Sequence, residues 1–390
     1  MTAVGDLLVE FKEKPGSGEE PPVLTLTERN GFVRQADRFN KRLATEDTSG
    51  YKVVRRNDIA FNPYLLWAGA VAQNTIVDEG VISPLYPTFR VRDGHDPRFV
   101  ARLLLTPQLI GAYDGIAFGS VPRRRRSSVA DFLNLPLAHI PPLPEQRRIA
   151  AILDQTDALC ARRRRALAHL DGLTQSVFHD MFGDPGENTR GWPQFPLGDV
   201  VVDISSGKSP VCEGRPAEPD EWGILKLGAV TYGMFDAGEH KAFLGDVTGM
   251  VANEVHRGDL LMTRKNTREL VGAVALVDEV RPRLLLPDLI FRLSIDEERV
   301  SKAYLQALLM NPRKRPQVRA LAAGSAGSMP NISRTRLRTL PVELPPRDLQ
   351  RSFARTLEAL RQQRLLQLSS LTALVELHEA LRSRAFAGAL

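Results

Sequence analysis

The sequence contains little cysteine and no long apolar run, and both absences limit what the protein can be. Its 390 residues include two cysteines, Cys160 and Cys212, which lie far apart in different surroundings. They can form neither a disulfide framework nor a cysteine-rich zinc site, which suits a reducing compartment. No stretch approaches the ~18 apolar residues of a membrane helix, and the first residues do not resemble a signal peptide. We therefore expect a cytoplasmic protein without a membrane partner.

Motifs of the common catalytic chemistries are also incomplete. Asn62-Pro63-Tyr64 approaches the Asn-Pro-Pro-Tyr type motif of adenine methyltransferases, but it lacks one proline, and no glycine-rich loop for S-adenosylmethionine precedes it. Ser206-Gly207-Lys208-Ser209 lacks the first glycine of a P-loop, and the seven histidines include no His-Glu-x-x-His motif. Asp199 and Asp203 lack the companions that a metal-dependent nuclease needs. We expect a chain that is not an enzyme and binds no cofactor or metal.

What the sequence does contain is a repeat of domain size. Short strings of the first half return in the same order about 200 residues later, as expected if one structural unit occurs twice. The matched strings are Val4-Gly5-Asp6 with Leu197-Gly198-Asp199, Arg56-Asn57-Asp58-Ile59 with Arg257-Gly258-Asp259-Leu260, Gly69-Ala70-Val71-Ala72 with Gly272-Ala273-Val274-Ala275, Leu135-Pro136 with Leu340-Pro341, Ile140-Pro141-Pro142 with Leu344-Pro345-Pro346, Gln146-Arg147 with Gln350-Arg351, and Phe182 with Phe386. We therefore expect an internal pseudo-two-fold repeat.

Each copy changes character at its double proline. Before it, short apolar runs separated by Gly, Pro and Asn predict strands and turns. After it, apolar residues recur every three to four positions, from Ile149 to Phe182 in the first copy and from Leu357 to Leu381 in the second. The prolines lack an amide donor and suit the first helical turn, so they end the preceding strand and begin the helix. A helix of about 38 residues would be ~57 Å long, and such helices usually pack on each other.

These patterns predict a fold of the α/β (α+β) class with four segments. Two globular domains of mixed sheet and helices, residues 1–144 and 183–346, alternate with two long helices, residues 145–182 and 347–390. We expect the two helices to pair as an antiparallel coiled coil, because that arrangement is pseudo-two-fold symmetric.

Positive charge gathers at a few places in this plan. The 52 Lys and Arg residues exceed the 46 Asp and Glu residues, and the net charge of +6 favours a polyanionic partner without requiring one. Arg123 to Arg126 fall on a predicted loop, where they contact phosphate or form a solvated turn. Arg162 to Arg165 fan around a helix, which favours a solvated or subunit-facing role. Arg264 to Arg268 follow a predicted strand with donors suited to base edges and phosphates.

The junction between domain and helix carries a family resemblance. The string Ile140-Pro141-Pro142-Leu143-Pro144-Glu145-Gln146-Arg147-Arg148-Ile149-Ala150-Ala151-Ile152-Leu153-Asp154 is similar to the junction in specificity subunits of type I restriction-modification enzymes. Phe182-Gly183-Asp184-Pro185 resembles that family's helix exit, and the resemblance covers the whole chain. The second junction departs from the pattern, since Arg347-Asp348-Leu349-Gln350 replaces Leu-Pro-Glu-Gln. Arg123 to Arg126 also occupy a place where Asn331-Ile332-Ser333 fits the pattern better.

The resemblance implies that DNA recognition and catalysis are carried out by different subunits. Each globular domain would be a target-recognition domain that reads one half of a bipartite site in double-stranded DNA, and the helices would set the spacing between the halves. Two adenine methyltransferase subunits and an ATP-dependent nuclease and translocase subunit would dock on the chain. S-adenosylmethionine, ATP and Mg would then be bound by those partners. Such a complex serves in defence against phage.

Candidate residues follow from the loops and from the helix junctions. The DNA-binding candidates are Asn62, Tyr64, Arg123, Arg124, Arg125, Arg126, Lys208, Arg264, Lys265, Asn266, Arg268, Ser328 and Asn331. The candidates for partner docking and for the helix junction are Glu145, Gln146, Arg147, Gln350 and Arg351. The loop that begins at Asn62 in the first copy differs from the loop that begins at Arg264 in the second copy. The two domains would therefore read different half-sites, although unconstrained divergence of the loops explains the difference nearly as well.

Two other functions remain open at this point. A stand-alone two-domain DNA-binding protein would bind its site as a purified single chain. A solitary DNA methyltransferase with disguised motifs would transfer methyl groups without added subunits.

Overall fold

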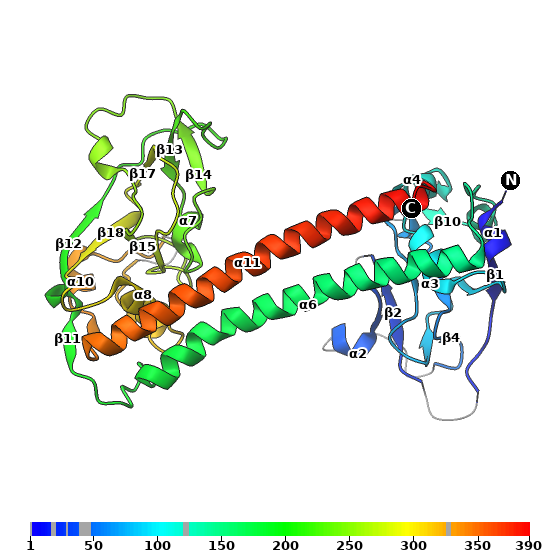
Figure 1. Cartoon of the computed structure of the whole chain (residues 1–390), viewed down its shortest axis with the longest axis horizontal. Helices are drawn as coiled ribbons and strands as arrows, with labels where there is room; N and C mark the ends of the chain where they lie inside the picture. Colours follow the sequence, from blue (N-terminus) through cyan, green and yellow to red (C-terminus); the bar gives the residue numbers. More distant parts are fainter. Residues whose placement is uncertain (1, 17–20, 29, 39–47, 120–124, 325–328) are drawn as a thin grey trace. The chain divides into compact units, whose positions relative to one another are not determined.

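The computed structural model describes residues 2–16, 21–28, 30–38, 48–119, 125–324 and 329–390. The chain divides into two compact units (Figure 1): unit 1 comprises Met1–Arg163 and Ser370–Leu390, and unit 2 comprises Arg164–Ser369. Both units mix sheets and helices, which confirms the predicted α/β class. In the part of the chain that the structure describes, no helix is both long and apolar enough for a membrane span.

Unit 1 is built on a four-stranded antiparallel sheet with the strand order β1-β8-β5-β6. Its strands are β1 (Leu8–Phe11), β8 (Thr88–Val91), β5 (Ile59–Phe61) and β6 (Val71–Gln73). Smaller pairs are β2 (Leu24–Thr27) with β3 (Gly31–Arg34), β4 (Lys52–Arg55) with β7 (Glu79–Ile82), and β9 (Ala117–Phe118) with β10 (Arg126–Ser127). The helices are α1 (Val4–Leu7), α2 (Gln35–Arg38), η1 (Leu66–Ala68), α3 (Pro97–Leu103), α4 (Pro107–Gly115) and α5 (Val129–Leu133). Packed aromatic rings of Phe61, Phe89 and Phe132 form the centre of the core.

Unit 2 contains a second four-stranded antiparallel sheet with the corresponding order β12-β18-β15-β16. Its strands are β12 (Val201–Ser206), β18 (Ile290–Ile295), β15 (Leu260–Thr263) and β16 (Val274–Leu276). A three-stranded sheet joins β14 (His240–Phe243), β13 (Trp222–Leu225) and β17 (Leu284–Leu285), and β11 (Gln194–Pro196) pairs with β19 (Pro341–Glu343). The helices are η3 (Leu197–Asp199), α7 (Gly228–Thr231), η4 (Val251–Asn253), α8 (Lys302–Met310), α9 (Arg315–Ala320) and α10 (Arg334–Arg338).

The same tight turn precedes β5 in unit 1 and β15 in unit 2. Asn57 and Gly258 adopt positive φ angles of 75° and 88°, a conformation that Gly and Asn tolerate best. The aspartate that follows each turn pairs with an arginine of the neighbouring strand. Asp58 lies 3.2 Å from Arg90, and Asp259 lies 3.0 Å from Arg292. Asp58 and Asp259 are at matching positions of the strings Arg56-Asn57-Asp58-Ile59 and Arg257-Gly258-Asp259-Leu260.

Two helices of 40 residues each, α6 (Leu143–Phe182) and α11 (Arg347–Phe386), follow the double prolines. Within unit 1, Ile149 near the start of α6 and Ala385 at the end of α11 belong to one apolar core. Within unit 2, the end of α6 and the start of α11 share another core, where the Phe182 and Phe353 rings are 5.1 Å apart. Apolar packing on each unit therefore fixes both ends of each helix.

A buried glutamine fastens the first turn of each long helix to its unit. Gln146 Nε2 donates to the Pro141 carbonyl at 2.8 Å, and its Oε1 accepts from the amide of Asp96 at 2.9 Å. Gln350 repeats this arrangement with the Pro345 carbonyl and the amide of Ser301, both at 2.8 Å. Since Asp96 and Ser301 are the N-cap residues of α3 and α8, each glutamine connects the start of a long helix to the start of a shorter one.

We expect Gln350→Leu to lower the free energy of unfolding by about 2 to 4 kcal/mol, because it leaves the Ser301 amide and the Pro345 carbonyl buried without partners. Urea unfolding followed by circular dichroism measures the change. Gln155→Leu, on the exposed side of α6, is the control and is expected to stay within about 0.5 kcal/mol of the native chain. Equal losses for the two variants would contradict the role assigned to Gln350.

Candidate nucleic-acid interface

Two arginines lie over one aromatic ring at one end of the inner strands of the four-stranded sheet in unit 2. The guanidinium carbons of Arg264 and Arg334 lie 5.5 Å and 5.9 Å from the centroid of the Phe291 ring. Arg264 comes directly after β15 and Arg334 begins α10, so residues 70 positions apart in the sequence meet here. Phe291 of β18 lies between the ends of two neighbouring strands, because it pairs with Ser206 of β12 and with Met262 of β15.

Polar contacts hold these arginines in place without neutralising them. Arg264 Nε donates to Asn331 Oδ1 at 3.0 Å, and Arg334 donates to the Ser206 hydroxyl at 3.3 Å. Lys265 forms a β-bridge with Asn331, which adds a third cationic residue to the cluster. Among the residues that the structure describes, no carboxylate forms an ion pair with these three cations. Uncompensated guanidinium and ammonium groups at a surface favour an anionic ligand.

Lys208 is positioned by an unusually close backbone approach. A Cβ atom at Gly207 would lie 1.6 Å from the Leu286 carbonyl oxygen, and the Gly207 amide donates to the Pro287 carbonyl at 3.1 Å. Only glycine allows this approach. The turn carries the exposed Lys208 away from the end of β12, the strand that also supplies Ser206. We define the basic edge of unit 2 as Arg264, Lys265, Arg334 and Lys208.

Asn266 is buried, whereas a side chain that reads bases would be exposed. It is 6% exposed, its Nδ2 donates to the Thr231 hydroxyl at 3.1 Å, and its Oδ1 accepts from the Thr267 amide at 2.8 Å. These bonds occupy the amide group within the unit, so Asn266 shapes the loop. Arg268, two residues later, is exposed.

In unit 1, the corresponding loop after β5 is also held by hydrogen bonds among its own residues. Asn62 is 9% exposed and accepts a hydrogen bond from the Tyr64 amide at 3.0 Å. Trp67 Nε1 donates to the Tyr64 carbonyl at 2.9 Å, and the Trp67 side chain is partly exposed. Asn62 is therefore a turn-forming residue, whereas Tyr64 is half-buried.

The two described arginines of the run Arg123 to Arg126 have different surroundings. Arg125 donates to Asp114 Oδ1 at 2.7 Å and to the Ala117 carbonyl at 3.0 Å, so its charge is already paired. Arg126, on β10, is exposed. Arg123, Arg124 and also Ser328 of unit 2 lie outside the described residues.

The remaining candidates lie at the starts of the long helices. Gln146 and Gln350 are 1% and 0% exposed, so their side chains belong to the helix junction and cannot reach a partner. Arg147 and Arg351 are exposed. Arg148 donates two hydrogen bonds to Glu145, and these bonds hold the pKa of the Glu145 carboxyl below its ordinary value.

Sequence reasoning missed Arg334 and Phe291 as members of the basic edge. The signal available was weak. The segment Arg334 to Arg338 has three arginines in five residues, but nothing local shows that its first arginine lies near Arg264, directly after β15. The contact depends on the pairing of β15 with β18, which brings Phe291 beneath both guanidinium groups.

Comparisons with known proteins agree with the resemblance seen in the sequence. Over 175 residues the chain is 31% identical to the specificity subunit of the type I restriction enzyme EcoEI from Escherichia coli. That match covers 45% of this chain and 30% of the relative, so the chain matches less than a third of that protein's length. No protein-family model matches the chain.

Two solved structures show the same fold. The type I restriction-modification specificity subunit from M. genitalium has a TM-score of 0.59 and 13% identity, with 98% of this chain and 95% of that chain covered. A chain from a study of type I restriction-modification complex assembly has a TM-score of 0.54 and 16% identity, with 100% and 97% covered. The resemblance to type I specificity subunits is thereby confirmed.

Proposed function

We propose that the chain is the DNA-specificity subunit of a type I restriction-modification complex, in which each unit reads one half of a bipartite site. The observation that carries this proposal is the match to the Escherichia coli specificity subunit, at 31% identity over 175 residues. The two corresponding sheet orders and the two equivalent glutamine junctions support a reader built from one unit used twice. Different loops on equivalent units would give the two half-sites different sequences.

The long helices would set the distance between the half-sites as an antiparallel coiled coil. Each unit contains the start of one helix and the end of the other, which is the arrangement that antiparallel helices produce. The ends of the helices also make equivalent contacts within their units. Phe386 packs against Phe99 of α3 at 5.4 Å, and Phe182 packs against Tyr304 of α8 at 4.8 Å. These contacts support a pseudo-two-fold repeat.

The basic edge of unit 2 would contact DNA through both phosphates and bases. Guanidinium groups donate to phosphate oxygens and can donate in pairs to O6 and N7 of guanine in the major groove. Because Asn331 and the Phe291 ring hold Arg264 in a fixed orientation, Arg264 is the better candidate for base reading. Exposed Lys208 is the better candidate for phosphate contact.

Catalysis in this proposal belongs to the partners. Two methyltransferase subunits would bind S-adenosylmethionine and methylate an adenine on each strand, and the nuclease and translocase subunit would bind ATP and Mg. Both kinds of partner subunit would dock on the chain. The exposed Arg147 and Arg351, near the starts of the long helices, are candidates for the docking surface.

A methylation assay tests whether catalysis requires the partner subunits. The purified chain is incubated with DNA and tritiated S-adenosylmethionine, with and without methyltransferase subunits encoded in the same source genome. We expect incorporation only in their presence, and single-molecule sequencing of the methylated DNA is expected to show a split motif. Methyl transfer by the chain alone, or a continuous motif, would overturn the proposal.

Arg264→Ala is expected to weaken binding to the cognate site by about 1 to 3 kcal/mol and to relax the sequence preference in one half-site, because a positioned guanidinium is lost. Competition binding of the assembled methyltransferase complex to a library of variant sites measures both effects. Arg257→Ala, which removes an exposed arginine before the other end of β15, is the control. A uniform loss of affinity with unchanged preference would assign Arg264 to phosphate contact instead.

A further inference from the structure

A buried arginine lies behind the loop that carries two cations of the basic edge in unit 2. We define this loop, residues 264–272, which follows β15, as the recognition loop of unit 2. Arg315, the first residue of α9, is 6% exposed, so its side chain is not available to a ligand. Its Nη2 donates to the Val271 carbonyl at 2.7 Å, and its Nη1 donates to the Gly272 carbonyl. Arg315 therefore holds the end of the recognition loop from inside the unit.

Among the residues that the structure describes, every hydrogen-bond partner of the Arg315 side chain is a carbonyl of this loop. The third is the Glu269 carbonyl, 3.4 Å from Nη2. In the same part of the chain, no backbone amide donates to the Val271 or Gly272 carbonyl, and no carboxylate pairs with Arg315. Burial lowers the pKa of Arg315 to about 10, so the guanidinium is still protonated at neutral pH. Loss of this cation would leave two buried carbonyls without a partner.

The recognition loop is closed at its base and exposed at its tip. The Gly272 amide donates to the Thr263 carbonyl at 2.9 Å, and the Thr263 hydroxyl donates to the Leu270 carbonyl at 3.1 Å. Residues 267–269, at the tip, are exposed. The cations Arg264 and Lys265 lie in the first half of the loop, whereas Arg315 holds the second half. A displacement of the second half would therefore be transmitted through the tip to the two cations.

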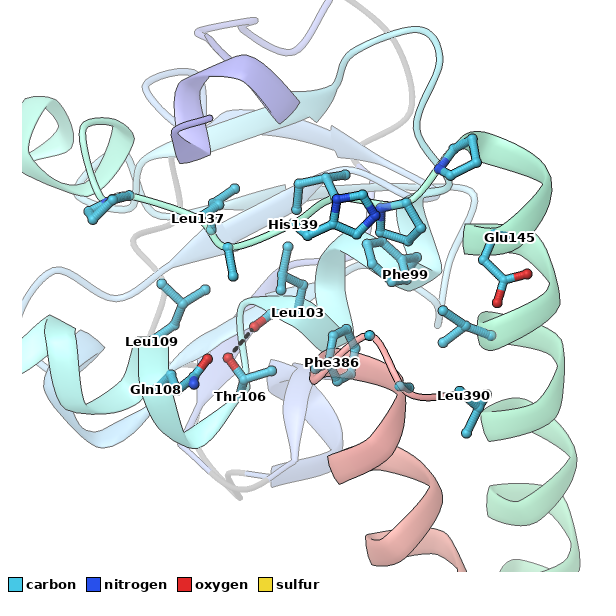
Figure 2. Close-up of a pocket in the computed structure, with 18 of the residues that line it drawn as sticks. Phe99, Leu103, Thr106, Gln108, Leu109, Leu137, His139, Glu145, Phe386 and Leu390 are labelled. Carbon is cyan, nitrogen blue, oxygen red and sulfur yellow. Dashed lines mark hydrogen bonds between the residues drawn. The ribbon is translucent and has the colours of Figure 1, made fainter. Parts of the chain in front are cut away.

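Unit 1 has an isoleucine at the position equivalent to Arg315. In unit 2, the Arg315 amide donates to the Asn311 carbonyl at 2.9 Å. In unit 1, the Ile110 amide of α4 donates in the same way to the Thr106 carbonyl at 3.0 Å, and a proline follows both Asn311 and Thr106. Figure 2 shows the start of α4, where the Thr106 hydroxyl also donates to the Leu103 carbonyl at 2.8 Å. The two units thus share this turn but not the guanidinium.

The loop of unit 1 pairs its carbonyls with its own amides instead. Gly69 matches Gly272 in the sequence repeat, and its carbonyl accepts from the Val71 amide at 2.7 Å. The Leu66 carbonyl accepts from the Gly69 amide, also at 2.7 Å. Ile110 lies beside this turn, since a Cβ atom at Gly69 would be 3.5 Å from its Cδ1. The corresponding loops are therefore held by different means, locally in unit 1 and by a buried cation in unit 2.

We propose that Arg315 is a positioning residue that sets the sequence preference of unit 2 for its half-site by holding the recognition loop. This inference rests on the proposed DNA-reading function, and it adds a determinant that does not touch DNA. A side chain that reads a base must be held within about 0.5 Å of its productive position, so a loosened loop lowers the discrimination that Arg264 provides. Because unit 1 lacks this guanidinium, the preference for the other half-site is independent of Arg315.

Competition binding of the assembled methyltransferase complex to a library of variant sites tests the inference. Arg315→Met is expected to reduce discrimination against substituted bases in one half-site about fivefold or more and to leave the other half-site within about twofold. Arg315→Lys offers one nitrogen in place of two and is expected to reduce it about twofold to fourfold. Arg313→Met is the control, because it removes the same charge from a side chain that is 75% exposed and pairs with Asp184. It is expected to leave both preferences unchanged.

Hydrogen exchange of the complex without DNA measures the loop directly and covers the case in which Arg315→Met does not fold. The amides of residues 264–272 are expected to exchange faster in Arg315→Lys than in the native chain and at the native rate in Arg313→Met. Native exchange in Arg315→Lys, native preference in the folded Arg315 variants, or equal loss of discrimination in both half-sites would overturn the inference alone. A native complex without any half-site preference would overturn the proposed function, and the inference with it.

Discussion

Insertion of four residues into each long helix is expected to lengthen the spacer between the two half-sites by one or two base pairs. Four helical residues add about 6 Å, and a base pair adds about 3.4 Å along the DNA axis. The insertions fall between Arg163 and Arg164 of α6 and between Ser369 and Ser370 of α11, where the helices pass from one unit to the other. Four residues are close to one turn, so the apolar faces rotate by only about 40°.

Methylation mapping of a strain that carries this variant measures the spacer and the half-sites together. The half-site bases are expected to stay the same, because no residue of either sheet or of the basic edge changes. The control is an insertion of the same four residues beside exposed Gly249, which has a φ of 75° in a loop of unit 2. Changed half-site bases with an unchanged spacer would count against the proposed role of the helices.

The long helices could be predicted from the sequence because their signals are local. Apolar residues at a spacing of three to four and a double proline before them indicate a helix without reference to any other segment. The predicted starts at residues 145 and 347 compare with Leu143 and Arg347 in the structure. The pairing of these helices as a coiled coil depends on contacts between distant segments, and it stays a proposal.

The candidate site was less predictable because its geometry is not local. Asn62 and Asn266 have the side chains that read adenine, but both are buried and form hydrogen bonds within their own units. Arg125 has the charge that contacts phosphate, but Asp114, 11 residues earlier, pairs with it. Arg334 joins the basic edge through the ring of Phe291, a relation that only the sheet register reveals.

Lys314→Met is expected to lower the free energy of unfolding by about 3 to 5 kcal/mol, because it leaves a buried carboxylate without its counter-ion. Lys314 is fully buried, and its Nζ lies 2.8 Å and 3.0 Å from the two carboxylate oxygens of Glu343, which is 2% exposed. After the substitution, the Gln194 amide at 2.8 Å is the one remaining side-chain donor to this carboxylate among the described residues.

Urea unfolding monitored by tryptophan fluorescence measures the effect, and a double variant separates the charge from the packing. Lys314→Met combined with Glu343→Leu removes both charges and is expected to recover most of the loss, since apolar pairs often replace buried ion pairs at little cost. Lys302→Met breaks the more exposed pair with Glu297 in the same unit and is expected to cost less than about 1 kcal/mol. If the double variant were no more stable than Lys314→Met, the loss would come from packing around the lysine stem, and the pair would have no electrostatic role in joining β19 to the N-terminus of α9.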